Sequence, residues 1–209
     1  DTKPYNSEYQ IMDITADDVV EGYEPVEGET LVMRGHKIRG KDVGIYMQPY
    51  NDPDDPSYIS VNKADGTSSF DNYKYQVSGK FTIEAIDMTL SVDGYEKAYD
   101  AKSHGVTVTV NKQEELPEGA KVYYSLVDPE SEDFDEGNWS EKPPKWKDVD
   151  LDSDRNPVSH TVYVKVELAN YNTAYGNADV TILQKQIKVH GEDTKPYNSE
   201  YQIMDITAD

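Results

Sequence analysis

The sequence of 209 residues contains no cysteine. No disulfide framework, thiolate nucleophile or cysteine-ligated metal site is therefore available to this chain. Small secreted domains of eukaryotes usually depend on disulfides, so that class of protein is disfavoured, whereas a secreted bacterial protein remains compatible with the sequence.

Positive charge is also scarce, because Lys and Arg total 20 against 41 Asp and Glu, which gives a net charge of −21. Such a surface cannot neutralise phosphates, which excludes nucleic acid as a partner and argues against docking on anionic membranes. No apolar run reaches the roughly 18 residues that a membrane-spanning helix needs, so we expect no membrane insertion by these residues. The 17 tyrosines nevertheless exceed what a disordered acidic chain carries, and they indicate a folded protein.

What the sequence does contain is an internal repeat. Residues 1–17 and residues 193–209 both read DTKPYNSEYQIMDITAD, so the two copies are offset by 192 residues. Identity at all 17 positions cannot arise by chance. It indicates a tandem array, of which the chain spans one period and the start of the next. An artificial duplication of one end is the alternative.

A weaker repeat divides the period in two. Each half carries a K-x-Y-[ND] motif near its start, then an Asn-Tyr pair, a glycine and a closing Thr-Ile strand. The matching segments are Lys3–Asn6 with Lys97–Asp100, Asn72-Tyr73 with Asn170-Tyr171, Gly79 with Gly176, and Thr82-Ile83 with Thr181-Ile182. We therefore predict a first β-module at residues 1–85, a second at residues 86–185, and the start of the next repeat copy at residues 186–209.

The pattern inside each module predicts β-strands. Alternating runs rich in Val, Thr and Tyr are separated by Pro and Gly, and only residues 15–23 favour a helical turn. The expected strands are 8–14, 30–35, 43–48, 73–77, 80–85, 104–111, 121–127, 160–168 and 178–184, with residues 49–69 as a long loop. Several short strands in each module predict an all-β fold of Ig-like sandwiches, with a β-grasp-like sheet as the alternative.

The joins between modules carry no flexible linker. Residues 81–94 run from the closing strand of the first module into the opening strand of the second without a Gly- or Pro-rich stretch, and residues 180–191 repeat this arrangement. Stiff strand-to-strand joins predict tandem modules arranged as a rod. Together with the high negative charge, they predict a monomeric and elongated particle.

Several of these motifs together resemble the MBG and YDG-type repeat modules of large bacterial surface proteins. The shared features are the lead strand with K-x-Y-[DN], the V-G-x-Y stretch at Val43–Tyr46, the Asn-Tyr pair and the closing G-x-x-T-I strand. Met88–Lys185 is the closer match, although Ala101 stands where a glycine usually follows Y-D, and the first module has Asn6-Ser7 in place of Asp-Gly. The resemblance implies adhesin stalk repeats that are secreted and anchored to a bacterial cell wall.

One acidic loop has the composition of a calcium site. Asp150, Asp152 and Asp154 alternate along it, and alternate oxygen ligands are what Ca²⁺ binds. The EF-hand template fails, because Arg155 and Thr161 occupy the positions of its glycine and its bidentate glutamate. A solvated acidic loop is the expected interpretation, so no cofactor is expected, and calcium bound at the three aspartates is the alternative.

Trp139 and Trp146, the only tryptophans, flank a Pro-Pro pair in the segment GNWSEKPPKW. Exposed indole rings stack on the apolar C–H faces of sugars, which makes both residues candidate glycan contacts. The alternative is that they pack a long loop against the sheet. The four histidines are scattered, and neither a nucleophile elbow nor a phosphate-binding glycine loop is present. The chain is therefore not expected to be an enzyme.

These observations predict an extracellular stalk repeat at the bacterial cell surface that projects a distal binding region; a glycan- or mucin-binding repeat that acts by avidity is the alternative. The expected partners are neighbouring repeats of the same protein, together with host or matrix glycans under the alternative. Residues 186–209 repeat the start of a module apart from the rest of it. They predict head-to-tail strand exchange between molecules, because an unpaired strand edge accepts another strand.

Overall fold

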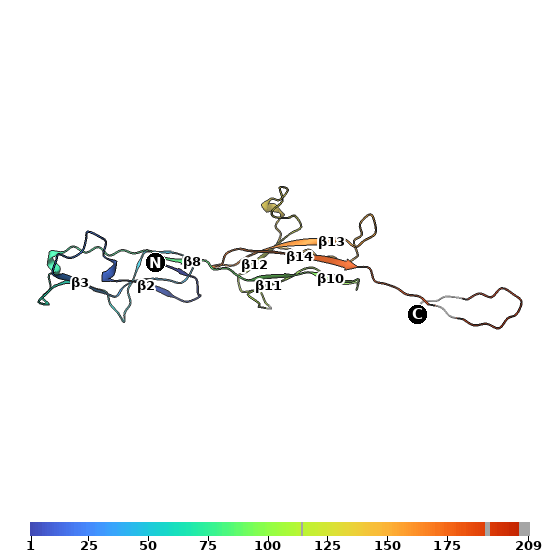
Figure 1. Cartoon of the computed structure of the whole chain (residues 1–209), viewed down its shortest axis with the longest axis horizontal. Helices are drawn as coiled ribbons and strands as arrows, with labels where there is room; N and C mark the ends of the chain where they lie inside the picture. The colour runs from blue at the N-terminus through green and yellow to red at the C-terminus, as the bar shows by residue number, and fades with distance from the viewer. Residues whose placement is uncertain (114, 191–192, 205–209) are drawn as a thin grey trace. The chain divides into compact units, whose positions relative to one another are not determined.

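The computed structural model describes residues 1–113, 115–190 and 193–204. Strands dominate these residues, and the helices among them are three short 3-10 turns, η1 (Ala16–Asp18), η2 (Phe70–Asn72) and η3 (Glu136–Asn138) (Figure 1). The all-β class predicted from the sequence is therefore confirmed. Within the described ranges, no helix is long and apolar enough to cross a membrane.

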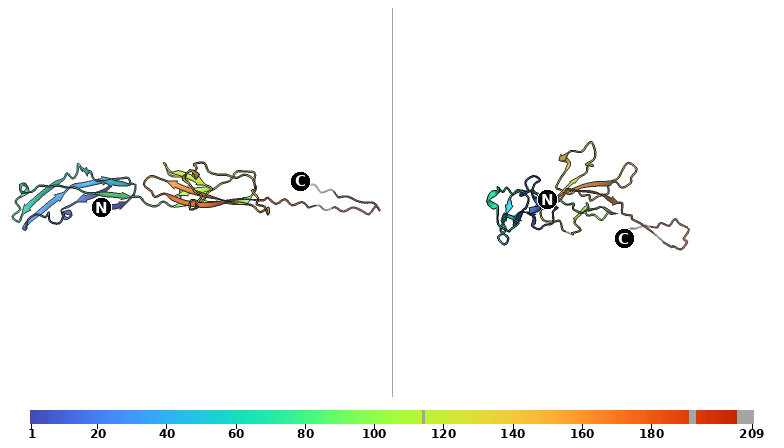
Figure 2. Two further views of the ribbon diagram at one scale, coloured as in Figure 1. Left: turned by 90° about the horizontal axis from the view of Figure 1, so that it is seen from above. Right: turned by 60° about the vertical axis from the view of Figure 1, so that its left-hand side comes forward.

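The chain folds into two compact units, and the strands of each lie side by side (Figure 2). Unit 1 comprises Asp1–Thr89 together with Glu118–Ala120 and Glu167–Ala174, and unit 2 comprises Leu90–Pro117, Lys121–Val166 and the chain from Tyr175 onward. The first boundary falls directly before the strand that opens unit 2, in a stretch that contains neither Gly nor Pro (residues 85–89).

Unit 1 has three small sheets. Its strands are β1 (Thr2–Pro4), β2 (Gln10–Ile14), β3 (Glu29–Arg34), β4 (His36–Gly40), β5 (Gly44–Tyr46), β6 (Pro49–Tyr50), β7 (Tyr58–Lys63) and β8 (Phe81–Glu84). The first sheet has the order β1-β8-β5, the second has the order β2-β4-β6, and the third pairs β3 with β7. The β1–β8 ladder is parallel, whereas the others are antiparallel.

The core of unit 1 is made by its first two sheets. Ile38 of β4 is 2% exposed, and Phe81 and Ile83 of β8 are 0% and 1% exposed. Phe81 and Ile83 are alternate residues of one strand, so both side chains point to the same face of the sheet. The half-buried side chains packed against them are Tyr5, Met12, Ile14 and Tyr46. Strand β2 therefore turns its Met12 and Ile14 side chains toward the core.

The described residues of unit 2 form two sheets. Its strands are β9 (Leu90–Asp93), β10 (Tyr95–Ala98), β11 (Thr107–Val110), β12 (Lys121–Ser125), β13 (Ser159–Glu167) and β14 (Ala174–Leu183). The larger sheet has the order β10-β14-β13-β12, and β11 pairs with β9 in the other. Val162, Val164 and Val166 alternate along β13 and are 0% exposed, as is Val180 of β14. This alternation is the valine pattern from which the strand was predicted.

The K-x-Y strand has the same partner in both units. Lys3 lies opposite Ile83 in the parallel β1–β8 ladder, and Lys97 lies opposite Ile182 in the parallel β10–β14 ladder. The tyrosine of the motif then extends each ladder by one backbone hydrogen bond of 2.9 Å, from Tyr5 to Glu84 in unit 1 and from Tyr99 to Leu183 in unit 2. The half-period repeat of the sequence therefore corresponds to a repeat in the structure, because the K-x-Y strand pairs with the Thr-Ile strand in the same register in both units.

The segment that opens unit 2 changes sheets at Gly94. Before this glycine, β9 pairs antiparallel with β11, and after it β10 pairs parallel with β14. A Cβ atom on Gly94 would collide with the backbone carbonyl of Asp179. Glycine is required here by this close backbone approach.

The residues after K-x-Y form the same turn three times. In each turn an Asn or Asp side chain accepts a hydrogen bond of 2.9–3.1 Å from the backbone amide two residues ahead. The residue that follows it has a positive φ, and the pairs are Asn6-Ser7 (φ 70°), Asp100-Ala101 (φ 64°) and Asn198-Ser199 (φ 64°). A positive φ favours glycine, which gives a physical reason for the glycine that the resembling modules carry at this position.

Replacing Ala101 by glycine is expected to raise the free energy of unfolding of unit 2 by about 0.5–1 kcal/mol. The left-handed conformation costs a residue with a Cβ atom roughly 1–2 kcal/mol, and the greater unfolded-state entropy of glycine offsets part of the gain. Urea titration followed by tryptophan fluorescence measures the change, because both tryptophans lie in unit 2. The matched control, Ala98→Gly in strand β10, should lower stability instead; a loss in both variants would contradict the explanation.

The second copy of the repeat keeps the local conformation of the first without its strands. The side-chain hydrogen bonds from Lys3 to the Ile11 carbonyl and from Gln10 to the Pro4 carbonyl recur from Lys195 to Ile203 and from Gln202 to Pro196. Residues 193–204 nevertheless contain no strand, and Tyr197 is 89% exposed whereas its counterpart Tyr5 is half-buried (Figure 1). The turn is thus encoded locally, whereas strand pairing requires the rest of a module.

Unit 1 differs from the sequence prediction in several segments, and two of its strands, β1 and β4, were not predicted. Residues 49–69, expected as a loop, contain β6 and β7, and β7 pairs with β3 along its whole length. Residues 73–77, expected as a strand, alternate between half-buried and exposed but belong to no ladder. The Tyr73 hydroxyl donates to the Glu29 carboxylate at 2.8 Å, so this segment is held by side chains in place of a strand partner.

Candidate functional site

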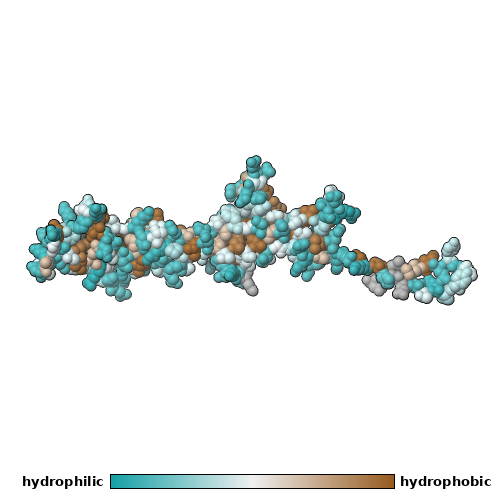
Figure 3. Space-filling view, in the orientation of Figure 1, coloured by the Kyte–Doolittle hydropathy of each residue, from teal (hydrophilic) through white to brown (hydrophobic). Residues whose placement is uncertain are grey.

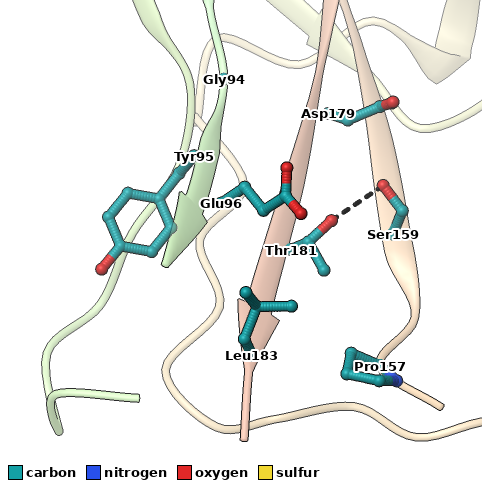
Figure 4. A pocket seen from close by; sticks show the side chains of 8 residues that line it. All are labelled: Gly94, Tyr95, Glu96, Pro157, Ser159, Asp179, Thr181 and Leu183. Atoms are coloured by element: carbon teal, nitrogen blue, oxygen red, sulfur yellow. Dashed lines mark hydrogen bonds between the residues drawn. The ribbon is translucent and has the colours of Figure 1, made fainter. Parts of the chain in front are cut away.

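A groove of about 600 Å³ lies on one face of the larger sheet of unit 2 (Figure 4). Asp179, Thr181 and Leu183 are alternate residues of β14 and share this face, whereas Val180 and Ile182 between them are buried on the other. The remaining lining comes from Gly94, Tyr95 and Glu96 at β10 and from Pro157 and Ser159 at the start of β13. The regular pleat of three neighbouring strands therefore positions the groove.

The polar groups of this groove are carboxylates and hydroxyls. Thr181 Oγ1 donates to Ser159 Oγ at 3.0 Å, and Glu96 extends over the groove beside Thr181 (Figure 4). Asp179 Oδ1 accepts a hydrogen bond of 2.7 Å from the Thr161 hydroxyl. None of the eight lining residues is Lys, Arg or His. The groove can therefore accept hydrogen bonds from a hydroxyl-rich ligand, but it offers no cation to an anionic one.

Tyr95, one of the lining residues, stacks on His104 with ring centroids 3.8 Å apart and an interplanar angle of 11°. Burial raises the pKa of the Tyr95 hydroxyl, and the charge of Asp100 raises this pKa further. The hydroxyl is therefore protonated at neutral pH and can donate a hydrogen bond. Sequence reasoning treated His104 as isolated, because its ring partner lies on a different strand.

Trp146, predicted as a glycan contact, is half-buried and belongs to the same region of unit 2. Its backbone exchanges two hydrogen bonds with His104, of 2.8 and 2.9 Å. Its indole stacks on the His160 imidazole, with ring centroids 4.5 Å apart and an interplanar angle of 12°. One face of the Trp146 ring is thus covered by protein.

Trp139, the second predicted glycan contact, is also half-buried. Phe134 meets its ring edge-on, with centroids 5.5 Å apart, and the Lys165 ammonium lies 5.3 Å from the ring centre. A cation over an indole face is a favourable contact in itself. The two tryptophans therefore have separate protein partners, and glycan stacking on either of them stays a prediction.

The acidic loop forms a turn around Asp152. The Asp152 Oδ1 atom accepts hydrogen bonds from the backbone amides of Asp154 (2.9 Å) and Asn156 (2.8 Å). Asp150 lies apart from it, with Oδ2 at 3.3 Å from Nε2 of His160. Among the described residues, no group of three or more His, Asp or Glu side chains is placed to hold a metal ion. Oδ2 of Asp152 accepts a longer hydrogen bond, of 3.4 Å, from the Asn156 side-chain amide, so this oxygen can still ligate a calcium ion.

Asp152→Asn is expected to lower stability at neutral pH but not in strong acid. The amide of Asn156, and after it the Asn156 side chain and the Asp154 amide, lower the pKa of the Asp152 carboxyl. A lowered folded-state pKa contributes stability that is present above the unfolded value of about 3.9 and is lost as the pH falls through the folded value. Urea unfolding of the parent protein and of the variant should show that the difference between their free energies of unfolding shrinks from pH 7 to pH 2.5. A difference that stays constant over this range would contradict the explanation.

Under the calcium alternative, millimolar calcium is expected to raise the melting temperature of unit 2 relative to chelator, because an ion that binds only the folded state adds stability by mass action. The rise should disappear when Asp150 and Asp154 are both replaced by asparagine. Asp148→Asn, which removes an exposed charge next to the triplet, is the matched control and should retain the rise. An unchanged melting temperature in the parent protein would end the calcium hypothesis.

Neither the comparison with protein-family models nor the search of curated proteins finds a match to this chain.

Proposed function

We propose that this chain is a structural stalk repeat of an extracellular adhesin at a bacterial cell surface, which holds a distal binding region away from the cell. The observation that carries the proposal is the recurrence of residues 1–17 at 193–209 without a single difference. Interchangeable copies suit a spacer, because a spacer needs length and reproducible joins more than it needs one unique site.

The fold of each unit supports this proposal. Both units pair their K-x-Y strand with their Thr-Ile strand in one register, as expected of modules repeated along a chain. We infer that each module is an Ig-like sandwich, because a β-grasp sheet packs against an α-helix and the described part of the chain has none. The stretch of residues 85–89 between β8 and β9 is short and lacks Gly and Pro, which favours a stiff join.

Surface chemistry also supports an extended spacer. Hydrophilic residues cover most of the face shown in Figure 3, and the net charge of −21 opposes close packing of one molecule on another. We therefore propose that the molecule is monomeric in dilute solution, with the modules stacked as a rod.

Small-angle scattering on proteins of one and two periods tests the stalk. One period should give a radius of gyration well above the roughly 17 Å of a compact chain of this length. Adding a period should increase the maximum dimension by a constant step. A flexible Gly-Ser insert after Asp87 is the control for the join. With this insert, the increase in maximum dimension for each added period should no longer be constant. A value near 17 Å for one period would overturn the proposal.

A glycan-binding repeat is the second candidate, and the groove of Figure 4 is the observation that favours it. Glu96, Ser159 and Thr181 present acceptors and hydroxyls to one groove, a combination that suits the hydroxyl groups of sugars. A glycan array probed with the whole chain would test it. The glycan-binding function would be favoured over a pure spacer if binding is lost in Glu96→Gln, Trp139→Ala or Trp146→Ala. Binding should be retained in Glu118→Gln, which lies outside the groove.

A further inference from the structure

Strand β2 leaves one edge without a strand partner. It is the outer strand of the β2-β4-β6 sheet and pairs only with β4 there. The Ile11 carbonyl accepts a hydrogen bond of 2.8 Å from the Lys3 ammonium, so this carbonyl points away from β4. Alternate residues of a strand point their backbone groups to the same edge, so Asp13 presents its amide and carbonyl to this edge as well.

A groove of about 410 Å³ runs along that edge. Four consecutive residues of β2, Ile11–Ile14, line one side, and Ser78–Lys80 at the approach to β8 line the other. Lys3 and the carboxylates of Asp1 and Asp18 complete it. A groove bounded by a strand edge on one side and an extended segment on the other has the form that a further strand would fill.

Unit 2 contains such a strand. There β9 pairs antiparallel with β11 immediately before the chain crosses at Gly94 into the K-x-Y strand β10. Leu90 and Val92 of β9 are half-buried, whereas Ser91 and Asp93 are exposed. In unit 1 the K-x-Y strand β1 is present, but none of the strands in the described part of the chain occupies the place of β9.

The sequence that belongs in this place can be read from the repeat. Residues 187–190 read I-K-V-H and precede the second copy, as L-S-V-D of β9 precedes β10, and a glycine follows in both cases. The apolar residues match in position, with Ile187 at Leu90 and Val189 at Val92. Both are exposed where they stand, at 82% and 54%, in a segment outside every strand.

We infer that the groove beside β2 is the acceptor site for Ile187–His190 of a second copy of this chain. The donor segment adds an antiparallel strand to the free edge of β2, with Ile187 and Val189 turned toward the core and Lys188 and His190 toward solvent. The groove is lined by three aspartates and two lysines, Asp1, Asp13, Asp18, Lys3 and Lys80. Lys188 would lie on the solvent side of the added strand, the side on which Asp13 is exposed. This assignment does not rest on the stalk function, because it concerns the pairing of two segments in any setting.

In the absence of a donor strand, the Lys3 side chain covers part of the free edge of β2. Its ammonium donates a hydrogen bond to the Ile11 carbonyl and lies 5.6 Å from the centre of the Phe81 ring. The Lys3 side chain therefore lies across the groove. A lysine on an open edge is a known means of blocking unwanted strand pairing. The donor strand must displace this contact, which makes association weak in the parent chain and stronger when Lys3 is shortened.

Contacts of this kind join one end of a molecule to the other end of the next, so they generate open chains and not closed dimers. Sedimentation of the full chain from about 10 μM to 1 mM, at a salt concentration that screens the negative charge, should show growth with concentration. The double variant Ile187→Asp, Val189→Asp should raise the apparent dissociation constant at least tenfold. Ile203→Asp is the matched control, because Ile203 is also an exposed apolar residue near the same end of the chain, and this substitution should leave the dissociation constant unchanged.

Hydrogen exchange locates the contact. With increasing concentration, the backbone amides of Ile11 and Asp13 should become protected, and Lys3→Ala should strengthen association several-fold. The three tail substitutions lie outside every strand, so loss of folding cannot explain their effects. Absence of growth at 1 mM, growth that persists in the double variant, or protection at another strand edge would each overturn the assignment. None of these outcomes bears on whether the modules form a rod, which scattering tests separately.

Discussion

Replacing Phe81 by alanine should reduce the free energy of unfolding of unit 1 by about 3–5 kcal/mol. The Phe81 ring is fully buried between two sheets, with Ile38 and Ile83 beside it, and the Tyr46 ring lies 6.3 Å away. Small domains have only about 5–15 kcal/mol of stability in total, so this one change should leave unit 1 close to unfolding.

Circular dichroism and tryptophan fluorescence can separate the units in this test, because both tryptophans belong to unit 2. The variant should lose part of its β signal at low urea while the tryptophan transition stays in place. Phe70→Ala is the matched control, since Phe70 is 42% exposed and stacks only on Tyr75 at the surface, and its cost should be much smaller. A single shared transition that shifts with Phe81→Ala would show instead that the two units unfold together.

Gly94→Ala should destabilise unit 2 by about 1–3 kcal/mol, because overpacking forces the backbone to move. The new methyl group would meet the Asp179 carbonyl, and the chain there cannot shift without disturbing the β10–β14 ladder on one side and the β9–β11 ladder on the other. Urea titration by tryptophan fluorescence measures the loss.

Ser91→Ala provides the reference for this substitution. Ser91 is an exposed residue of β9, three positions before the glycine, and its replacement should change stability by no more than about 0.5 kcal/mol. Equal effects of the two substitutions would mean that the close approach at Gly94 is not what fixes the strand crossing.

The elements that sequence reasoning predicted best are those whose pattern is independent of distant residues. Strand β13 repeats valine at every second position, and a strand with one buried face has that period in any fold. The turn at Asp100-Ala101 is also local, as its recurrence at Asn198-Ser199 demonstrates.

The elements that were missed depend on a partner. Residues 73–77 alternate as a strand does, yet no neighbouring strand is aligned with them, so they form no ladder. Strand β7 was hidden by the acidic, proline-containing segment before it, and it becomes a strand because β3 lies opposite. The same reason explains the groove of Figure 4, whose residues come from positions as distant in sequence as Glu96 and Asp179.

The parallel pairing of the K-x-Y strand has a mechanical consequence. When tension pulls the start of β10 and the end of β14 in opposite directions, the two strands must slide past each other, so all the bonds of the ladder resist the force together. Four residue pairs share this load in unit 2. In unit 1 three pairs share it together with Asp1, whose carbonyl accepts a hydrogen bond of 2.9 Å from the Thr82 amide. Tension applied across either unit in this way therefore loads its whole parallel ladder at once, and each unit should resist force by shear instead of opening one bond at a time.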